Sequence, residues 1–425
     1  MYKIIILVIS TIICSFYYFP FELVYFPGIN TKMVMAAISL ILLPIKLGKR
    51  GDANIELDFL WISIGASLIS LIAYFSIIYN NTIDTSYVGY IVSMWVWLGG
   101  AYTLIIILKK IYGYLSIELI VSTLVNVCIL QCVLAIIINS YPAFKSIVDN
   151  FLGGEAAMGV AEGRIYGIGA ALDVAGLRFS AVLVMVAFLV LHSAEYQKNI
   201  VWYVAAFLII SVVGNMIART TTMGLVLAIL YWTYSSICEK NNYGTILLWK
   251  RMIVLLIIAL PLIVVFYNYN QLFHDNIRFA FEGFFNLWEK GKWEVSSNDI
   301  LLNHMIVFPD NLRTWIIGDG YMADPSEYDI NYIGRTYHGY YMGTDIGYLR
   351  FIFYFGMIGL LAFMSFMWLS YKISSRKFES YKQMFFLVLL VNFIVWFKVS
   401  TDIFVVFALF LVLDNQDTSS KSIFS

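Results

Sequence analysis

The chain has 425 residues, of which 61% are hydrophobic and only 13% are charged. Soluble globular chains average roughly 45–50% apolar and ~25% charged residues, so a soluble fold could not bury this much apolar surface. Lysine plus arginine and aspartate plus glutamate number 27 each, which excludes the basic excess typical of nucleic-acid binding. Composition therefore predicts a polytopic membrane protein with a modest soluble portion.

Apolar runs long enough for a membrane helix recur along the whole chain. A bilayer core of ~30 Å requires about 20 apolar residues per helix. Twelve runs meet or approach this length: 3–20, 30–47, 59–79, 87–108, 115–140, 177–195, 199–217, 220–238, 251–269, 345–371, 381–397 and 399–414. We therefore expect an all-α polytopic integral membrane protein, a single domain over residues 1–425 with about twelve transmembrane helices. No Ala-x-Ala-like cleavage site follows the first run, so we expect it to be retained as a helix.

The distribution of lysine and arginine predicts the side of the membrane on which each loop lies. With a cytoplasmic N-terminus, every inside loop carries at least one Lys or Arg, whereas the outside loop at 80–86 has none. An even number of helices returns the C-terminus to the cytoplasm. Two long segments, 141–176 and 270–344, then lie outside as periplasmic loops. In the second, the stretch from Ile277 to Trp293 interleaves apolar and charged residues, which predicts amphipathic helices on the membrane surface.

The arginines are distributed against this insertion rule. Inside segments hold twelve Lys and three Arg, but seven of the ten arginines lie in outer segments or at outer helix ends: Arg164, Arg178, Arg219, Arg278, Arg313, Arg335 and Arg350. A guanidinium group binds phosphate oxygens through a planar fork of donors and stays charged at any working pH. We therefore expect the seven arginines to bind an anionic ligand, and a lipid-linked diphosphate is the obvious anion there. The alternative is that each anchors a helix end or pairs with an outer carboxylate.

A sugar transfer from a lipid diphosphate needs a base and charge neutralisation at the leaving group. Three outer carboxylates, Glu162, Asp173 and Asp345, are candidate catalytic groups. Asp345 opens a long apolar run, where capping of a helix is the alternative role. His338, in a Tyr-rich stretch suited to stacking on sugar rings, is a fourth candidate. For this histidine, a surface position without catalytic duty is the alternative.

The cysteines predict neither a disulfide nor a metal site. All four lie in apolar runs or at a membrane edge: Cys14, Cys128, Cys132 and Cys238. Two of them are one helical turn apart, but no histidine or further cysteine joins them. Lys398 and Asp402, four residues apart near the last span, predict a structural ion pair.

The whole-chain layout, with about twelve spans and a large late outer loop, resembles the bacterial O-antigen and capsule repeat-unit polymerases (the Wzy family) and their relatives, the O-antigen ligases. Five short stretches add to the resemblance: Gly163–Gly169, Ala218–Thr222, Trp315–Gly320, Thr344–Leu349 and Gly356–Gly359. The second is similar to the Ser-Arg-rich element of the family, although Ala218 replaces the usual Ser. Asp345 occupies the place where the ligases typically have His, which favours a polymerase.

The resemblance implies a metal-independent glycosyltransferase of the lipid-sugar-using C class, with no cofactor. The donor would be a growing glycan on undecaprenyl diphosphate, and the acceptor a single lipid-linked repeat unit at the periplasmic face of the bacterial inner membrane. A chain-length regulator and a flippase of the same pathway are the further partners implied. Two alternatives stay open: an O-antigen ligase, and a lipid-linked oligosaccharide flippase, against which the large outer loop argues.

Overall fold

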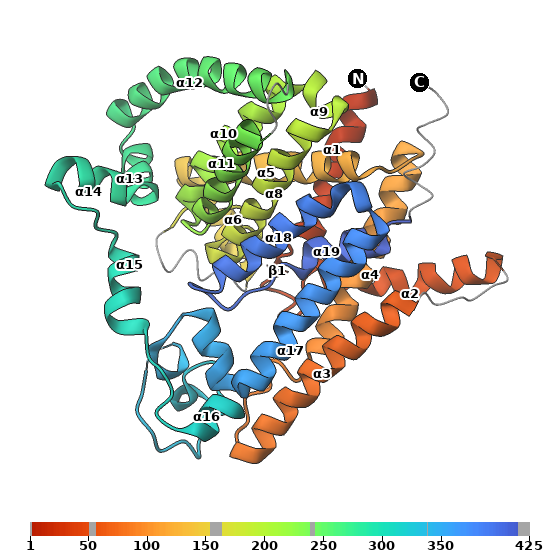
Figure 1. Ribbon diagram of the computed structural model, residues 1–425, viewed down its shortest axis with the longest axis vertical. Helices are drawn as coiled ribbons and strands as arrows, with labels where there is room; N and C mark the ends of the chain where they lie inside the picture. The colour runs from red at the N-terminus through yellow and green to blue at the C-terminus, as the bar shows by residue number, and fades with distance from the viewer. Residues whose placement is uncertain (1, 51–56, 154–163, 239–242, 338, 415–425) are drawn as a thin grey trace.

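The computed structural model describes residues 2–50, 57–153, 164–238, 243–337 and 339–414, and its architecture is almost entirely helical (Figure 1). Apolar helices dominate because a chain in lipid must satisfy its backbone hydrogen bonds internally. The amino-terminal helices are α1 (Tyr2–Tyr18), α2 (Thr31–Arg50), α3 (Leu57–Asn80), α4 (Tyr90–Tyr112) and α5 (Ile117–Ser140). The middle of the chain forms α6 (Pro142–Phe151), α8 (Leu172–His192), α9 (Ala194–Lys198), α10 (Ile200–Ile217), α11 (Thr221–Cys238) and α12 (Tyr243–Tyr269).

A segment of short elements follows α12 before the chain returns to long helices. It contains α13 (Gln271–Ala280), α14 (Glu282–Lys290), α15 (Ser296–Ile300), a π-helical turn (Leu301–Met305), α16 (Leu312–Ile316) and 3-10 turns at Pro325–Glu327 and Tyr341–Gly343. The last helices are α17 (Gly347–Lys377), α18 (Lys382–Val395) and α19 (Phe404–Val412), with a 3-10 turn at Glu379–Tyr381. Two-residue strands β1 (Glu22–Leu23) and β2 (Leu152–Gly153) form an antiparallel pair, a small exception to the all-α prediction.

Among the described residues, eight helices are long and apolar enough to cross a membrane: α3, α4, α5, α8, α10, α11, α12 and α17. This confirms a polytopic membrane protein, while the number of twelve spans stays a prediction. The apolar window of α8 is 94% buried inside the chain and that of α12 only 6%. In Figure 1, α12 accordingly runs along the edge of the molecule, and α8 lies within it.

Two groups of contacts join helix ends that lie far apart in the sequence. In one group, the Tyr381 hydroxyl donates to the Glu118 carboxylate at the start of α5. In the other, Lys398 and Asp173 form an ion pair of 3.2 Å. Each contact joins two segments that the sequence assigns to one side of the membrane, and the orientation itself stays a prediction.

A break in α17 connects the segment around α16 to the helical body. Phe355 and Gly356 leave helical geometry, with φ of +70° at the glycine. The backbone N–H of Asp319 donates to the Phe353 carbonyl at 2.6 Å, and that of Gly320 donates to the Tyr354 carbonyl at 3.1 Å. Carbonyl groups near the break thereby gain partners from the 318–320 loop.

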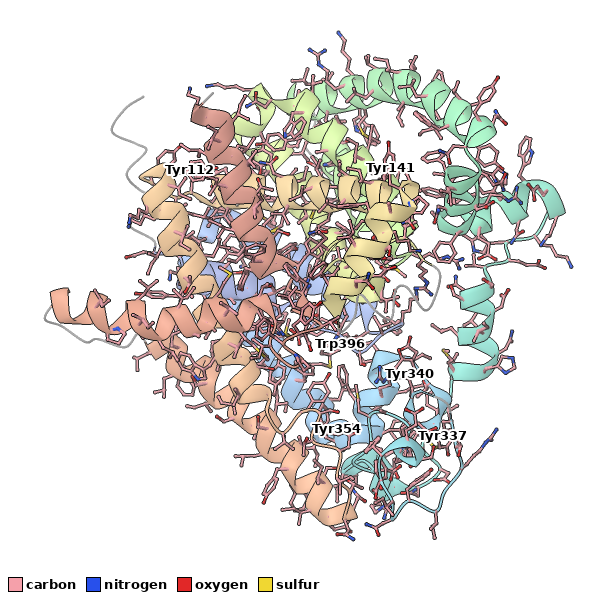
Figure 2. All side chains as sticks on the ribbon, turned by 180° about the vertical axis from the view of Figure 1, so that it is seen from behind. Tyr112, Tyr141, Tyr337, Tyr340, Tyr354 and Trp396 are labelled. Carbon is pink, nitrogen blue, oxygen red and sulfur yellow. The ribbon has the colours of Figure 1, made fainter. Side chains whose placement is uncertain are left out.

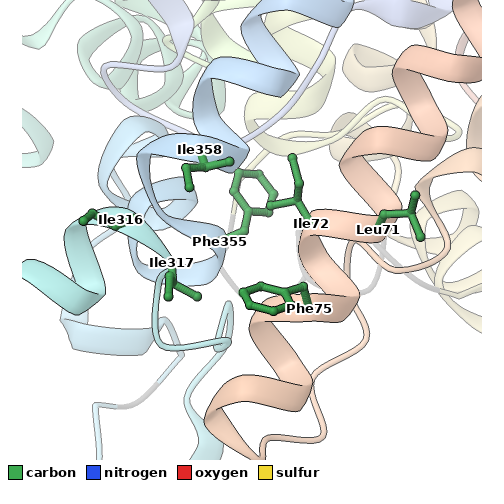
Figure 3. Close-up of a pocket in the computed structure, with 7 residues that line it drawn as sticks. All are labelled: Leu71, Ile72, Phe75, Ile316, Ile317, Phe355 and Ile358. Atoms are coloured by element: carbon green, nitrogen blue, oxygen red, sulfur yellow. The ribbon is translucent and has the colours of Figure 1, made fainter.

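The same break borders an apolar pocket between α3, α16 and α17. Figure 3 shows its lining: Leu71, Ile72, Phe75, Ile316, Ile317, Phe355 and Ile358. These side chains carry no polar group, so the pocket offers no chemistry of its own.

Candidate functional site

An irregular segment, residues 396–403, lies between α18 and α19 and organises the centre of the molecule. The fully buried Trp396 donates from its indole Nε1 to the Thr401 carbonyl, and Figure 2 shows this tryptophan near the middle of the fold. Asn392 accepts from the Ile403 backbone N–H at 3.0 Å. Side chains thus satisfy backbone groups that a continuous helix would have paired itself.

This segment differs from the expectation of two full spans at 381–397 and 399–414. Helices α18 and α19 have 14 and 9 residues, or roughly 21 and 14 Å of length at 1.5 Å per residue. Neither reaches the ~30 Å of a bilayer core. Hydropathy could not show that these helices are short. The buried residues of the irregular segment, Trp396, Val399 and Ile403, are as apolar as those of a helix.

Asp402, in this segment, joins a small group of charged side chains. Its carboxylate accepts from the Phe404 backbone N–H at 2.9 Å and from the Tyr90 hydroxyl, and it interacts electrostatically with Lys32 and Arg178. The Lys32 ammonium lies 3.9 Å from the centre of the Trp97 ring, and the Arg178 guanidinium 5.6 Å from it. Lys32, Arg178, Asp402 and Trp97 are called the central cluster below.

Arg178 is the most confined cation of the central cluster. It is 7% exposed, lies on the apolar helix α8, and faces Phe19 at 5.7 Å as well as Trp97. A cation within an apolar helix costs on the order of 2.5–3.5 kcal/mol at mid-membrane, so such residues usually face a wet cavity or a charged partner. Its position therefore indicates a polar site within the helical body.

The ion pair expected between Lys398 and Asp402 is replaced by two separate arrangements. Lys398 pairs with Asp173, five residues before Arg178 on α8, and Thr220 donates to the same carboxylate. Asp402 instead holds the first turn of α19 through the backbone N–H of Phe404. Sequence spacing failed here because the four-residue interval presumes a helix, and the segment is not helical.

The guanidinium groups of Arg219 and Arg164 both lie near the ring of one residue, Phe279. Their guanidinium groups lie 3.9 and 5.5 Å from the centre of the Phe279 ring on α13. Arg219 also donates to the Phe279 carbonyl and to Ser297, both at 3.0 Å, and pairs with Glu282 at 2.9 Å. Burial lowers the pKa of Arg219, which Glu282 opposes and the neighbouring charge of Arg164 reinforces. Arg219 therefore connects the α10–α11 turn to the segment after α12.

Arg350 and Asp345 form a further polar group at the start of α17. Their side chains are 3.5 Å apart, and the guanidinium lies 4.1 Å from the centre of the Tyr340 ring. It also donates to the Met322 carbonyl at 3.3 Å. The first turn of α17 has no side-chain cap, so Asp345 acts as an ion-pair partner in place of the capping role considered above.

Tyr87 relates this group to the central cluster, since it interacts electrostatically with both Asp402 and Arg350. The tyrosine precedes α4, and its ring packs 5.8 Å from that of Phe351 on α17.

The remaining predicted arginines lie at the surface of the segment 271–344. Arg278 makes a bidentate ion pair with Glu289 at 2.6 and 2.7 Å. Arg313 pairs with Asp319 at 3.2 Å, and Arg335 is exposed. The seven arginines therefore do not form one cluster: Arg164, Arg178, Arg219 and Arg350 lie at the helical body, and the other three do not. The candidates Glu162 and His338 lie outside the described residues.

Tyrosines and carboxylates build the surface near Arg350. Tyr321 donates to Asp329 at 2.7 Å, and Tyr328 donates to Asp84 at 2.9 Å. Burial raises the pKa of Tyr332 to about 12, so these phenols stay protonated donors near neutral pH. Figure 2 shows Tyr337, Tyr340 and Tyr354 gathered at this end of the molecule.

Four residues of the site were missed by sequence reasoning as functional candidates: Lys32, Tyr87, Trp97 and Asp402. Two of them carried a usable signal, because Lys32 and Asp402 are charges that border apolar runs. Within the described residues, no group of three or more His, Cys, Asp or Glu side chains is placed to hold a metal ion. No family model, curated protein or solved structure matches this chain.

Proposed function

We propose that this protein is a glycosyltransferase that polymerises undecaprenyl-diphosphate-linked oligosaccharide repeat units at the periplasmic face of the bacterial inner membrane. In this reaction, a hydroxyl of the acceptor repeat unit attacks the anomeric carbon of the donor glycan. The glycosidic bond forms as the bond to the lipid diphosphate breaks, and a carboxylate accepts the proton of the hydroxyl.

The single observation that carries the proposal is the central cluster. Lys32 and Arg178 converge on Trp97 next to Asp402, at the helix ends that the charge rule places outside. Cations confined among apolar helices are suited to a diphosphate, whose charge grows as it leaves. In the proposal, Arg178 and Lys32 stabilise the leaving diphosphate, and Arg350 binds the second one.

Three carboxylates lie close to these cations and are candidate bases. Asp173 is engaged by Lys398, and Asp345 by Arg350, so both are held in place by a cation. Asp402, which the structure adds to the candidates, belongs to the central cluster and interacts electrostatically with Lys32 and Arg178. The tyrosine-rich surface near Arg350 supplies aromatic faces of the kind that sugar rings stack on.

Replacement of Arg178 tests the proposal. The variants are expressed in a strain of the source organism from which the native gene has been deleted. Arg178→Ala should reduce the amount of long surface polysaccharide by roughly 10²–10³-fold, as loss of one transition-state contact does. Arg178→Lys should restore only part, because an ammonium lacks the planar fork. Arg335→Ala, at an exposed side chain of the segment 271–344, is the matched control.

Chain-length distributions and protein abundance, measured by gel and blot, decide the outcome. Full-length polymer from Arg178→Ala at normal abundance contradicts the role of this arginine. Transfer of finished glycan to lipid A core by the purified wild-type protein, without growth of the lipid-linked glycan, would identify a ligase instead.

A further inference from the structure

The first two helices after α12 form a hairpin whose outer face is strongly apolar. This α13–α14 hairpin spans residues 271–290, and the chain then turns back at Gly291. Its exposed side chains include Phe284, Leu287 and Trp288, which are 62%, 47% and 91% exposed, and Trp293 follows at 54%. Phe284, Phe285, Leu287 and Trp288 line a shallow apolar hollow on this surface. Phe284, Leu287, Trp288 and Trp293 are called the hairpin face below.

The position of the hairpin in the chain indicates what covers this face. Only Asn270 separates α13 from α12, and its side chain caps α13 by accepting from the Phe273 backbone N–H at 2.9 Å. Helix α12 is long and apolar enough to cross the membrane, and its surface is almost wholly unburied by the rest of the chain. A helix that begins one residue after such a lipid-facing helix starts at the membrane boundary.

The composition of the hairpin fits that boundary. Tryptophans are enriched where the hydrocarbon core meets the headgroups, since an indole ring is largely apolar but carries one N–H donor. Lys290, which lies 3.7 Å from the Glu294 carboxylate, and Lys292 are exposed beside the hairpin face, and basic side chains next to an apolar face favour anionic headgroups. On α13, the buried side chains of Ile277 and Ala280 face the protein.

The hairpin is also fixed to the helical body through the residues described above. Its base is closed against α12 by Tyr267, whose ring stacks on that of Phe285 at 5.7 Å. Farther along α13, Phe279 lies under Arg219 and near Arg164. The position of the hairpin therefore sets the position of the ring that both arginines contact.

We infer that the α13–α14 hairpin is an interfacial membrane anchor: the hairpin face lies at the headgroup–acyl boundary where α12 ends, and α13 thereby holds Phe279 against Arg219 and Arg164. The inference requires only that α12 crosses the membrane, so it is independent of the proposed glycosyltransferase activity.

Spin-label accessibility in the reconstituted full-length protein tests the anchor. Labels are placed at Trp288→Cys and, in a second variant, at Leu287→Cys, in a Cys238→Ala background because the other three cysteines are buried. The matched control is Ile330→Cys, an apolar position that is 99% exposed in the tyrosine-rich segment, residues 321–341. Vesicles contain phosphatidylcholine and phosphatidylglycerol, and collisions with oxygen and with a water-soluble nickel chelate are compared.

The expected result is that oxygen collisions exceed nickel collisions severalfold at 288 and 287, with the reverse ratio at 330. A nickel-dominated ratio at 288 and 287, equal to that at 330, would place the face in water and overturn the inference. Low collision rates for both reagents would show a face covered by protein, which overturns it equally.

Discussion

Gly356 has a backbone conformation that other residues rarely adopt, and its surroundings leave no room for a Cβ atom. Its φ is +70°, and a Cβ would collide with the Ile316 carbonyl of the α16 segment. At φ +70° and ψ −175°, the backbone lies in a region essentially restricted to glycine, which costs another residue of order 1–3 kcal/mol, and the collision adds about 1–3 kcal/mol. We therefore expect Gly356→Ala to destabilise the protein by about 2–6 kcal/mol, seen as a lower midpoint temperature of thermal unfolding in detergent.

Gly113→Ala provides a comparison at a positive-φ glycine where a Cβ meets no collision. Gly113 ends α4 with φ of +78°, and nothing lies within 4 Å of its Cβ position. Only the backbone term applies there, so the expected loss is about 1–2 kcal/mol. Equal losses for the two variants would contradict the close approach of α16 to the break in α17.

In the structure Arg219 contacts the segment after α12, whereas its sequence context predicted that it binds a diphosphate. All three nitrogens of its guanidinium contact the segment after α12, through Phe279, Ser297 and Glu282. Loss of a hydrogen bond to a charged group costs about 1.5–3 kcal/mol. Arg219→Ala and Arg219→Lys should therefore both accelerate amide hydrogen exchange over 271–300, by roughly 30-fold for ~2 kcal/mol. Exchange unchanged in Arg219→Ala would show that the arginine does not hold this segment.

At the scale of the elements, the α13–α14 hairpin contains a charge pair that acid should open. The hydrogen bond from Arg278 lowers the pKa of Glu289 from its ordinary value of 4.5. A carboxyl group with a lowered folded-state pKa stabilises the fold above its ordinary pKa, and the contribution is lost as the pH falls through the lowered value. The mobility of a spin label at Trp288→Cys should therefore rise as the pH falls from about 4.5 through the lowered pKa of Glu289. Glu289→Gln should abolish this dependence, and an identical profile in that variant would refute the role of the pair.

Most helices could be predicted from hydropathy, because a membrane helix must be apolar over a fixed length. The run at 59–79 became α3 (Leu57–Asn80), and that at 115–140 became α5 (Ile117–Ser140). The irregular segment 396–403 could not be predicted, since it depends on distant partners such as Tyr348, whose N–H donates to the Trp396 carbonyl. A hydropathy window contains no information on such contacts.

The candidate site could be predicted in part for the same reason. Arg178 and Arg219 were found because a cation beside an apolar run is rare enough to be noticed. Asp402 was noticed only as a partner of Lys398, because assigning it to Lys32 and Arg178 requires the packing of α19 against α4 and α8 against α18. Charge at a span end marks a polar site, but the tertiary fold decides which charges meet.

At the scale of the whole molecule, the two groups of helix ends make the predicted orientation testable. Arg376, near the end of α17, pairs with Asp58 at the start of α3, beside the ends that the charge rule assigns to the cytoplasm. The opposite end of α3 meets the 318–320 loop, where the Asn80 amide donates to the Gly318 carbonyl at 3.0 Å. Residues 141–176 and 270–344 should therefore share one side of the membrane, and 46–56, 239–250 and 372–382 the other.

Two exposed thiols report on the two sides. Cys238, at the end of α11, is the native exposed cysteine, and Ile330→Cys introduces one in the tyrosine-rich segment. A membrane-impermeant maleimide should label position 330 in intact spheroplasts, and Cys238 only after permeabilisation. Cys14, buried in α1, should stay unlabelled in both conditions and serves as the control for unfolding. Labelling of Cys238 in intact cells, with position 330 protected, would invert the topology and remove the central cluster from the face at which the proposed reaction takes place.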